Sequence, residues 1–247
     1  MRSFTDLSYG SLDMQKLDIY LPDSEEFAAF VYFHGGGLIN GSRKCFPEEV
    51  SEYFTKRGVA LISVEYRMYP DAEYPDFIED AAKSVAWVKN NISNYGNCKG
   101  IYVGGSSAGG YLSMMLCFDR RYLENEGVDP LEIKGWIHDA GQPTAHFVVL
   151  KNSGADSRRI IVDERAPLYY VGLEKEHSPM LVIVSDYDMQ NRYEQTMLLM
   201  STLKHFELDG NVELLVMHGT HCAYVQALDE KGDSVLGKAV CDFMAKY

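Results

Sequence analysis

Residues 101–111 of this chain read Ile-Tyr-Val-Gly-Gly-Ser-Ser-Ala-Gly-Gly-Tyr, an apolar run followed at once by a turn of small residues. The pattern predicts a buried strand and then an apolar helix that begins near Tyr111. Between them, Gly105 and Gly109 flank Ser107 in a G-x-S-x-G spacing, because larger side chains would collide with the strand and helix of a sharp turn. We therefore predict a strand–turn–helix unit that raises the Ser107 hydroxyl above a sheet, at the positive end of the helix.

The same alternation of apolar runs and helical patterns recurs along the chain. A half-exposed strand is predicted at residues 17–21, where apolar and polar residues alternate. Further buried strands are predicted at residues 28–33, 59–64, 133–138, 179–184 and 212–217. Apolar residues at three- and four-residue spacing predict helices at 76–92, 193–206 and 235–244. Strands that alternate with helices of this length form a mainly parallel sheet covered on both faces. Ligands bind such sheets beyond the carboxyl ends of the strands, so the residues just after each strand are the candidates for chemistry.

A second glycine-rich turn, His34-Gly35-Gly36-Gly37, follows another apolar run. Acyl transfer passes through a tetrahedral oxyanion, which needs backbone N–H donors that already point toward it. Glycines let the backbone approach a substrate with no side chain in the way. We predict that the N–H groups of Gly36, Gly37 and Ala108 form an oxyanion hole. His34 is expected to hold this loop by hydrogen bonding rather than to transfer protons.

The loops after the last two predicted strands supply an acid and a base. One reads Ser-Asp-Tyr-Asp and contains Asp186 and Asp188, and the other reads His-Gly-Thr-His and contains His218 and His221. A nucleophile, an acid and a histidine in this chain order match the serine–acid–histidine order of one known triad arrangement. His221 lies in the loop beyond the strand and is the favoured base, whereas His218 lies at the strand end. Asp186 and Asp188 both follow the strand predicted at 179–184, so their place in the chain does not decide which of them is the acid.

The glycine motifs at residues 34–37 and 105–109 together resemble the hormone-sensitive-lipase-like branch of the α/β-hydrolases, which includes bacterial acetyl esterases and carboxylesterases. Between them, residues 65–70 (Glu-Tyr-Arg-Met-Tyr-Pro) are similar to the Tyr-Arg-Leu-x-Pro segment of that family. The resemblance implies an α/β-hydrolase fold with a mainly parallel eight-stranded sheet and helices on both faces. The G-x-x-D spacing of the family, with Ser185 in the glycine position, selects Asp188 over Asp186.

The resemblance implies a catalytic triad of Ser107, Asp188 and His221. The chain departs from the family in having only 33 residues before His34, where the family carries a longer segment that helps to form a cap. The segment between the strands near 138 and 179 is also modest. We therefore expect one α/β-hydrolase domain over residues 1–247, with a small lid at about 142–170 and an open site suited to short acyl chains.

The amino-acid composition limits the classes of partner that the protein is expected to bind. The formal net charge of −13 disfavours nucleic acid and anionic membranes as partners. The chain shows no apolar run of signal-peptide or membrane-helix length, and its five cysteines have no CxxC spacing, so we expect reduced thiols and a cytoplasmic location. The chemistry of the triad needs no metal and no organic cofactor. The expected partner is a small-molecule ester, and the sequence leaves the oligomeric state open.

The sequence thus predicts a serine esterase for short-chain acyl esters, with acetylated or aryl-acylated carbohydrates among the candidate substrates. An amidase, a formamidase or a peptidase with the same triad is the alternative enzyme. Formamidases of similar architecture tend to carry tryptophan after His-Gly-Gly-x, where this chain has Leu38. A ligand-binding protein on an inactive hydrolase scaffold is the non-enzymatic alternative, and the presence of both Ser107 and His221 argues against it.

Overall fold

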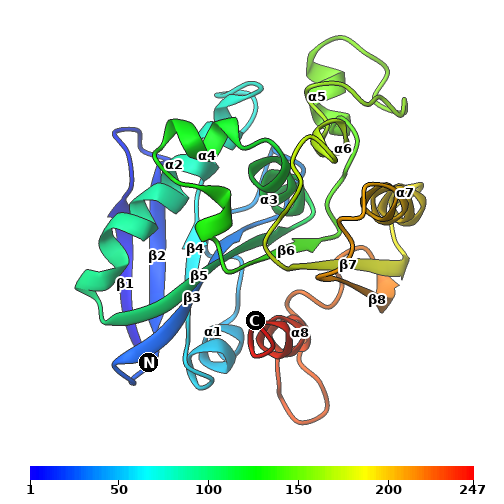
Figure 1. Ribbon diagram of the computed structural model, residues 1–247. Coiled ribbons are helices and arrows are strands. Elements are labelled where there is room, and N and C mark those ends of the chain that lie inside the picture. Colours follow the sequence, from blue (N-terminus) through cyan, green and yellow to red (C-terminus); the bar gives the residue numbers. More distant parts are fainter.

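Eight strands form one continuous sheet through the centre of the molecule (Figure 1). The computed structural model describes residues 1–247, and its strands are β1 (Arg2–Ser8), β2 (Lys16–Leu21), β3 (Glu26–Phe33), β4 (Val59–Val64), β5 (Asn97–Ser106), β6 (Gly135–Asp139), β7 (Met180–Tyr187) and β8 (Val212–Thr220). Their order across the sheet is β1-β2-β4-β3-β5-β6-β7-β8. β2 runs antiparallel to both of its neighbours, and every other pair is parallel. The predicted eight-stranded, mainly parallel sheet is confirmed.

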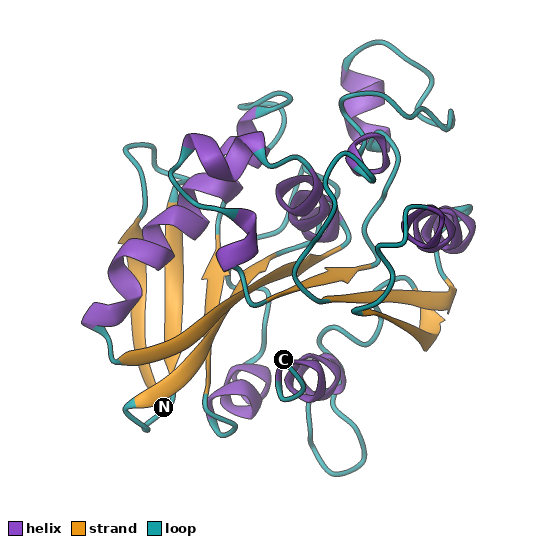
Figure 2. Cartoon of the chain, viewed as in Figure 1, coloured by secondary structure: helices purple, strands orange, loops and turns teal.

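Helices cover both faces of this sheet (Figure 2). They are α1 (Glu48–Thr55), α2 (Asp76–Asn91), α3 (Ala108–Phe118), α4 (Arg121–Asn125), α5 (Phe147–Asn152), α6 (Pro167–Tyr170), α7 (Arg192–His205) and α8 (Val235–Met244). In Figure 1, α1 and α8 lie below the sheet, and α2, α3, α4 and α7 lie above it. No helix combines the length and the apolar character needed to cross a membrane.

The central strands are buried on both faces, so their side chains divide between two hydrophobic cores. In β3, Ala29, Val31 and Phe33 point into the larger core beneath α2 and α3. The intervening Phe30 and Tyr32 point into the smaller core against α1 and α8. Successive side chains of a strand alternate between its faces, and burial of both faces requires a continuous apolar run. This is why the sequence pattern identifies the central strands.

The strand β1 is the one strand that the residue pattern does not predict. It pairs with β2 at the edge of the sheet, and nearly all of its residues are exposed. An edge strand of this kind needs no apolar face, so it carries no periodic signal. The three helices predicted at 76–92, 193–206 and 235–244 are present as α2, α7 and α8, and each begins and ends within one residue of its predicted range.

The carboxyl ends of six parallel strands, β4, β3, β5, β6, β7 and β8, lie at one edge of the sheet. Phe33 pairs with Gly105, Ser106 pairs with Asp139, and the register continues through β7 to Thr220 at the end of β8. The segment that follows β6, residues 142–170, contains α5 and α6 and lies beyond α3 in Figure 1. Loops from distant parts of the sequence are therefore neighbours along this edge.

Candidate active site

Ser107 occupies the tight turn between β5 and α3. Its backbone has φ +57° and ψ −111°, which a residue with a side chain rarely adopts, and its N–H donates to the carbonyl of Asp139 at 2.8 Å. A β carbon at Gly109 would lie 1.9 Å from the Phe33 carbonyl oxygen, and one at Gly105 would lie 2.5 Å from the same atom. Glycine is therefore required on both sides of Ser107, and the predicted strand–turn–helix unit is present.

Ser107, His221 and Asp188 form a continuous chain of hydrogen bonds. The Ser107 Oγ lies 2.8 Å from His221 Nε2, and His221 Nδ1 lies 2.5 Å from Asp188 Oδ1. The carboxylate of Asp188 is fully buried and accepts further bonds from the N–H groups of Met189 and Ser185. Burial opposes ionisation of Asp188, but the hydrogen bond and charge of His221 outweigh it and lower the pKa of the carboxyl. Asp188 is thus held as an anion behind the imidazole.

The two competing candidates pair with each other instead. Asp186 Oδ2 lies 2.8 Å from His218 Nδ1, and its other oxygen accepts the N–H of Gly219 at 2.8 Å. The side chain of His218 is 85% exposed, so this pair faces solvent. The hydrogen bonds that Asp186 accepts from Gly219 and His218 lower the pKa of its carboxyl. Neither residue is hydrogen-bonded to Ser107: Asp186 lies within β7, whereas Asp188 follows the end of that strand.

Of the three predicted oxyanion donors, Gly36 shares a cavity with Ser107 and Ala108 follows Ser107 in the chain. Gly36 and Gly37 have φ values of +115° and +66°, and their N–H groups donate to no other group of the chain. Ala108 is the first residue of α3, so its N–H has no partner inside the helix. Gly36 lines a cavity of about 490 Å³ that also contains Ser107 and His221. Gly37 does not line that cavity and faces Phe147.

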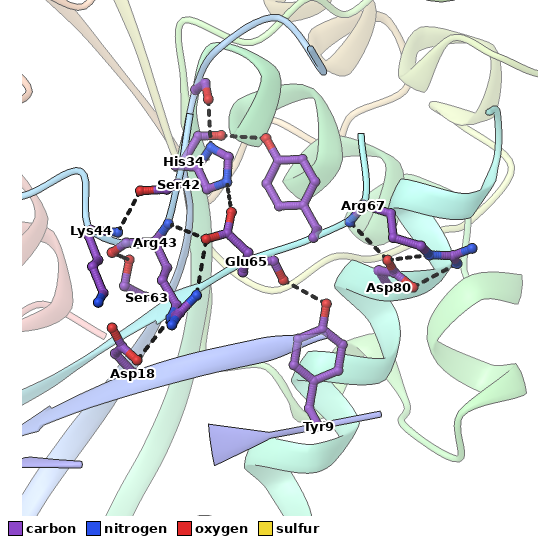
Figure 3. A network of polar contacts seen from close by, with 12 residues as sticks. Tyr9, Asp18, His34, Ser42, Arg43, Lys44, Ser63, Glu65, Arg67 and Asp80 are labelled. Carbon is purple, nitrogen blue, oxygen red and sulfur yellow. Dashed lines mark hydrogen bonds and ion pairs between the residues drawn. The ribbon is translucent and has the colours of Figure 1, made fainter. Parts of the chain in front are cut away.

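His34 anchors the glycine-rich loop, as expected from the sequence (Figure 3). Its Nδ1 lies 2.7 Å from the Gly35 carbonyl oxygen, and its Nε2 lies 3.1 Å from Glu65 Oε1. The hydroxyl of Tyr66 donates to the His34 carbonyl, and the Tyr66 ring stacks on the imidazole. Burial raises the pKa of the Glu65 carboxyl, but its hydrogen bonds to His34 and Arg43 produce a net lowering. The glycine-rich loop is therefore held through His34 by the buried, ionised carboxylate of Glu65.

Asp139 is a buried carboxyl that the sequence analysis missed. It ends β6, next to Ser106 of β5, and it accepts hydrogen bonds from the Ser106 hydroxyl and the Tyr224 hydroxyl. Burial raises its pKa to about 6, although these two hydrogen bonds favour the ionised form. Its backbone carbonyl holds the N–H of Ser107. The sequence did contain a clue to Asp139, because this acidic residue directly follows the strand predicted at 133–138, where functional residues were expected.

The raised pKa of Asp139 predicts a pH-dependent loss of stability. An unfolded aspartate ionises near pH 4, so the folded protein binds more protons than the unfolded chain between pH 4 and 6. Stability should therefore fall by about 3 kcal/mol as the pH rises through this range, and Asp139→Asn should remove that fall. Urea unfolding of both proteins at pH 4, 5, 6 and 7 measures the difference. Parallel pH profiles of the two proteins would contradict the prediction.

Two further side chains near the site have structural contacts. Cys222 Sγ lies 3.7 Å from His221 Nε2, and burial raises the pKa of its thiol, which disfavours a reactive thiolate. His146 is buried and accepts the N–H of Val148, which makes it the cap of α5. No group of three histidine, cysteine, aspartate or glutamate side chains is arranged to hold a metal ion.

A mainly parallel eight-stranded sheet with a glycine-flanked serine at the turn between β5 and α3 is the arrangement of the α/β-hydrolase fold. In the following comparisons the chain is similar to proteins with esterase and lipase names. A family model described as BD-FAE matches residues 17–132. The solved structure of a truncated form of carbohydrate esterase from gut microbiota superposes with a TM-score of 0.76 at 19% identity, over 100% of this chain and 96% of that one.

Curated relatives carry esterase and lipase names. A probable isoprenylcysteine alpha-carbonyl methylesterase of Arabidopsis thaliana is 30% identical over 122 residues, which are 48% of this chain and 29% of that protein. Lipase 2 of a Moraxella species is 26% identical over 237 residues, which are 86% of this chain and 52% of that protein. This chain thus spans about half, or less, of the length of these relatives.

Proposed function

We propose that this protein is a serine esterase for short-chain acyl esters. The observation that carries the proposal is the unbroken hydrogen-bond chain from Ser107 Oγ through His221 to the buried carboxylate of Asp188. An isolated serine hydroxyl is a weak nucleophile, and an adjacent base held by a third group is the arrangement that activates it. The esterase and lipase names of the relatives support the same reaction class.

The geometry leads to an acyl-enzyme mechanism. His221 takes the proton from Ser107 as the hydroxyl attacks the ester carbonyl, and Asp188 stabilises the imidazolium that forms. The N–H groups of Ala108 and Gly36, with Gly37 as a third candidate, stabilise the oxyanion. His221 then protonates the departing alcohol, and a water molecule repeats the sequence to release the acid. Every proton in this cycle moves through His221.

Two features support a small ester as the substrate. The cavity above Ser107 is about 490 Å³ and combines polar backbone with a few apolar side chains, which suits a short acyl group. We propose that residues 142–170 act as a small cap within a single domain, because the segment contains only the short helices α5 and α6. The solved carbohydrate esterase makes acetylated or aryl-acylated carbohydrates candidates for this chain as well.

Hydrolysis of p-nitrophenyl acetate, butyrate and decanoate tests the proposed function. We expect kcat/KM for acetate or butyrate to exceed that for decanoate by about tenfold or more, because few of the residues that line the cavity are hydrophobic and the added methylene groups gain little apolar contact. The matched anilides, p-nitroacetanilide and p-nitrobutyranilide, test amidase activity. If the folded protein cleaves the anilides but no ester, the proposed function changes from esterase to amidase. A folded protein that cleaves neither would leave a binding role.

A further inference from the structure

A second cavity of about 360 Å³ lies between residues 157–160 of the cap segment and the start of α7. Its lining includes Arg158, Arg159 and Arg192, and it includes no aspartate or glutamate. The remaining polar groups are serine, glutamine and asparagine side chains, which can donate hydrogen bonds. In a chain with a net charge of −13, a cavity lined by three arginines and no acid is a local reversal of sign.

This cavity adjoins the site already described. Phe147 lines it and also lies against Gly37, where a β carbon would be 3.7 Å from the ring. Met189 lines it as well, and its N–H donates to the carboxylate of Asp188 at 2.7 Å. The cavity is therefore in contact with both the glycine-rich loop and the acid loop. The two cavities share no lining residue, so an ester that occupies both must extend across this boundary.

Arg192 is a buried cation without an acidic partner. Only 4% of the residue is exposed, and its guanidinium donates to the Ala140 carbonyl at 2.7 Å and to Gln142 Oε1 at 3.3 Å, both neutral acceptors. Burial lowers the pKa of Arg192 to about 10, against the opposing influence of Asp188. A buried charge with no ion pair is costly in free energy, so an anion beside it would be stabilising.

The two other arginines stand at the mouth of the cavity. Arg159 is exposed and forms no ion pair, whereas Arg158 pairs with Asp156 at 2.7 Å. The cavity also includes the first turn of the fourteen-residue helix α7, whose N-terminal end carries a partial positive charge. Arg159 and this helix end thus add positive potential to that of Arg192, which Asp188 offsets only in part.

We propose that this cavity binds an anionic group of the substrate, so that the preferred esters carry a carboxylate or a similar anion close to the scissile bond. The inference rests on the proposed esterase function and names its substrate class. Arginine binds carboxylates through charge-assisted hydrogen bonds that are stronger than neutral ones. Arg192 supplies the fixed charge at the base of the cavity, and Arg158 and Arg159 close around the anion from the cap.

Two matched substrate pairs test this, one for each side of the ester. The first is p-nitrophenyl hemiglutarate with its terminal amide, and the second is 4-acetoxybenzoate with 4-acetoxybenzamide. In at least one pair we expect the carboxylate to be preferred in kcat/KM by about tenfold. The double variant Arg158→Gln/Arg159→Gln should remove the preference through a rise in KM for the anionic ester alone. Arg2→Gln, which removes a charge at the far edge of the sheet, should leave the preference unchanged.

The outcomes separate the two proposals. The neutral member of each pair reports esterase activity alone, so its cleavage tests the proposed function without the anion site. Preference for the neutral ester in both pairs, or an unchanged preference in the double variant, overturns the anion site. If no ester is cleaved, calorimetric measurement of the binding of 4-acetoxybenzoate and 4-acetoxybenzamide still tests whether the cavity binds an anion. Equal affinity for the two compounds then overturns the proposal, and tighter binding of the carboxylate that is lost in the double variant supports it.

Discussion

Replacement of Ser107 by alanine is expected to lower kcat for p-nitrophenyl acetate by about 10⁴- to 10⁶-fold. The hydroxyl lies 2.8 Å from His221 Nε2, and no other hydroxyl in the cavity is bonded to that base. Loss of the nucleophile leaves the oxyanion donors and the cavity intact, so substrate binding should persist with little turnover. Steady-state hydrolysis measures kcat, and the near-ultraviolet circular dichroism spectrum confirms that the variant is folded.

Ser106→Ala is the matched control for this variant. Ser106 is the preceding residue, but its hydroxyl donates to the Asp139 carboxylate and has no contact with His221. We expect this variant to retain activity within about tenfold of the wild type, because it loses only one supporting hydrogen bond. If Ser106→Ala were the inactive variant and Ser107→Ala the active one, the assignment of the nucleophile would be wrong.

The substitution Asp188→Asn should lower kcat by about 10⁴-fold while preserving the fold. The amide can donate to His221 Nδ1, which favours the tautomer whose Nε2 already carries a proton and cannot accept one from Ser107. The amide also cannot stabilise the imidazolium that forms during attack. Because the carboxylate is fully buried and bonded to His221 at 2.5 Å, solvent cannot replace it.

Asp186→Asn provides the comparison at a carboxylate two residues away. Its partners are the exposed His218 and the N–H of Gly219, and neither reaches Ser107. We expect kcat to change by less than about threefold, as is usual for an exposed pair. Measured side by side on one ester, the two variants identify the acid. A larger loss in Asp186→Asn than in Asp188→Asn would reverse the assignment.

Most of the fold could be predicted from the sequence, because burial of a strand or helix imposes a local pattern. The run at 59–64 and the helical spacing at 76–92 correspond closely to β4 and α2, since a strand buried on both faces must be apolar throughout. Short or exposed elements carry no such pattern. The strand β1 and the short helices α5 and α6 are of this kind, and packing against the rest of the molecule defines them.

The candidate site divides in the same way. Motif spacing predicts Ser107 and the glycine-rich loop, and family resemblance selects Asp188 from two nearby carboxylates. The catalytic roles of these residues stay predictions that the variants above test. Spacing alone could not reveal that Asp186 pairs with His218 and that Asp188 pairs with His221, because these pairs join residues more than thirty positions apart that only the packed structure brings together.

By itself, the sequence determined the strand–turn–helix unit around Ser107 and the alternation that produces the sheet. The steric demands of a sharp turn and of a buried strand act between neighbouring residues, so they are written in short stretches of the chain. Only the tertiary structure decided the rest. It joined Ser107 to a base 114 residues away, buried Asp139 beneath the turn, and gathered three arginines around one cavity. Distances and burial between remote residues arise only when the chain is packed, and no local pattern encodes them.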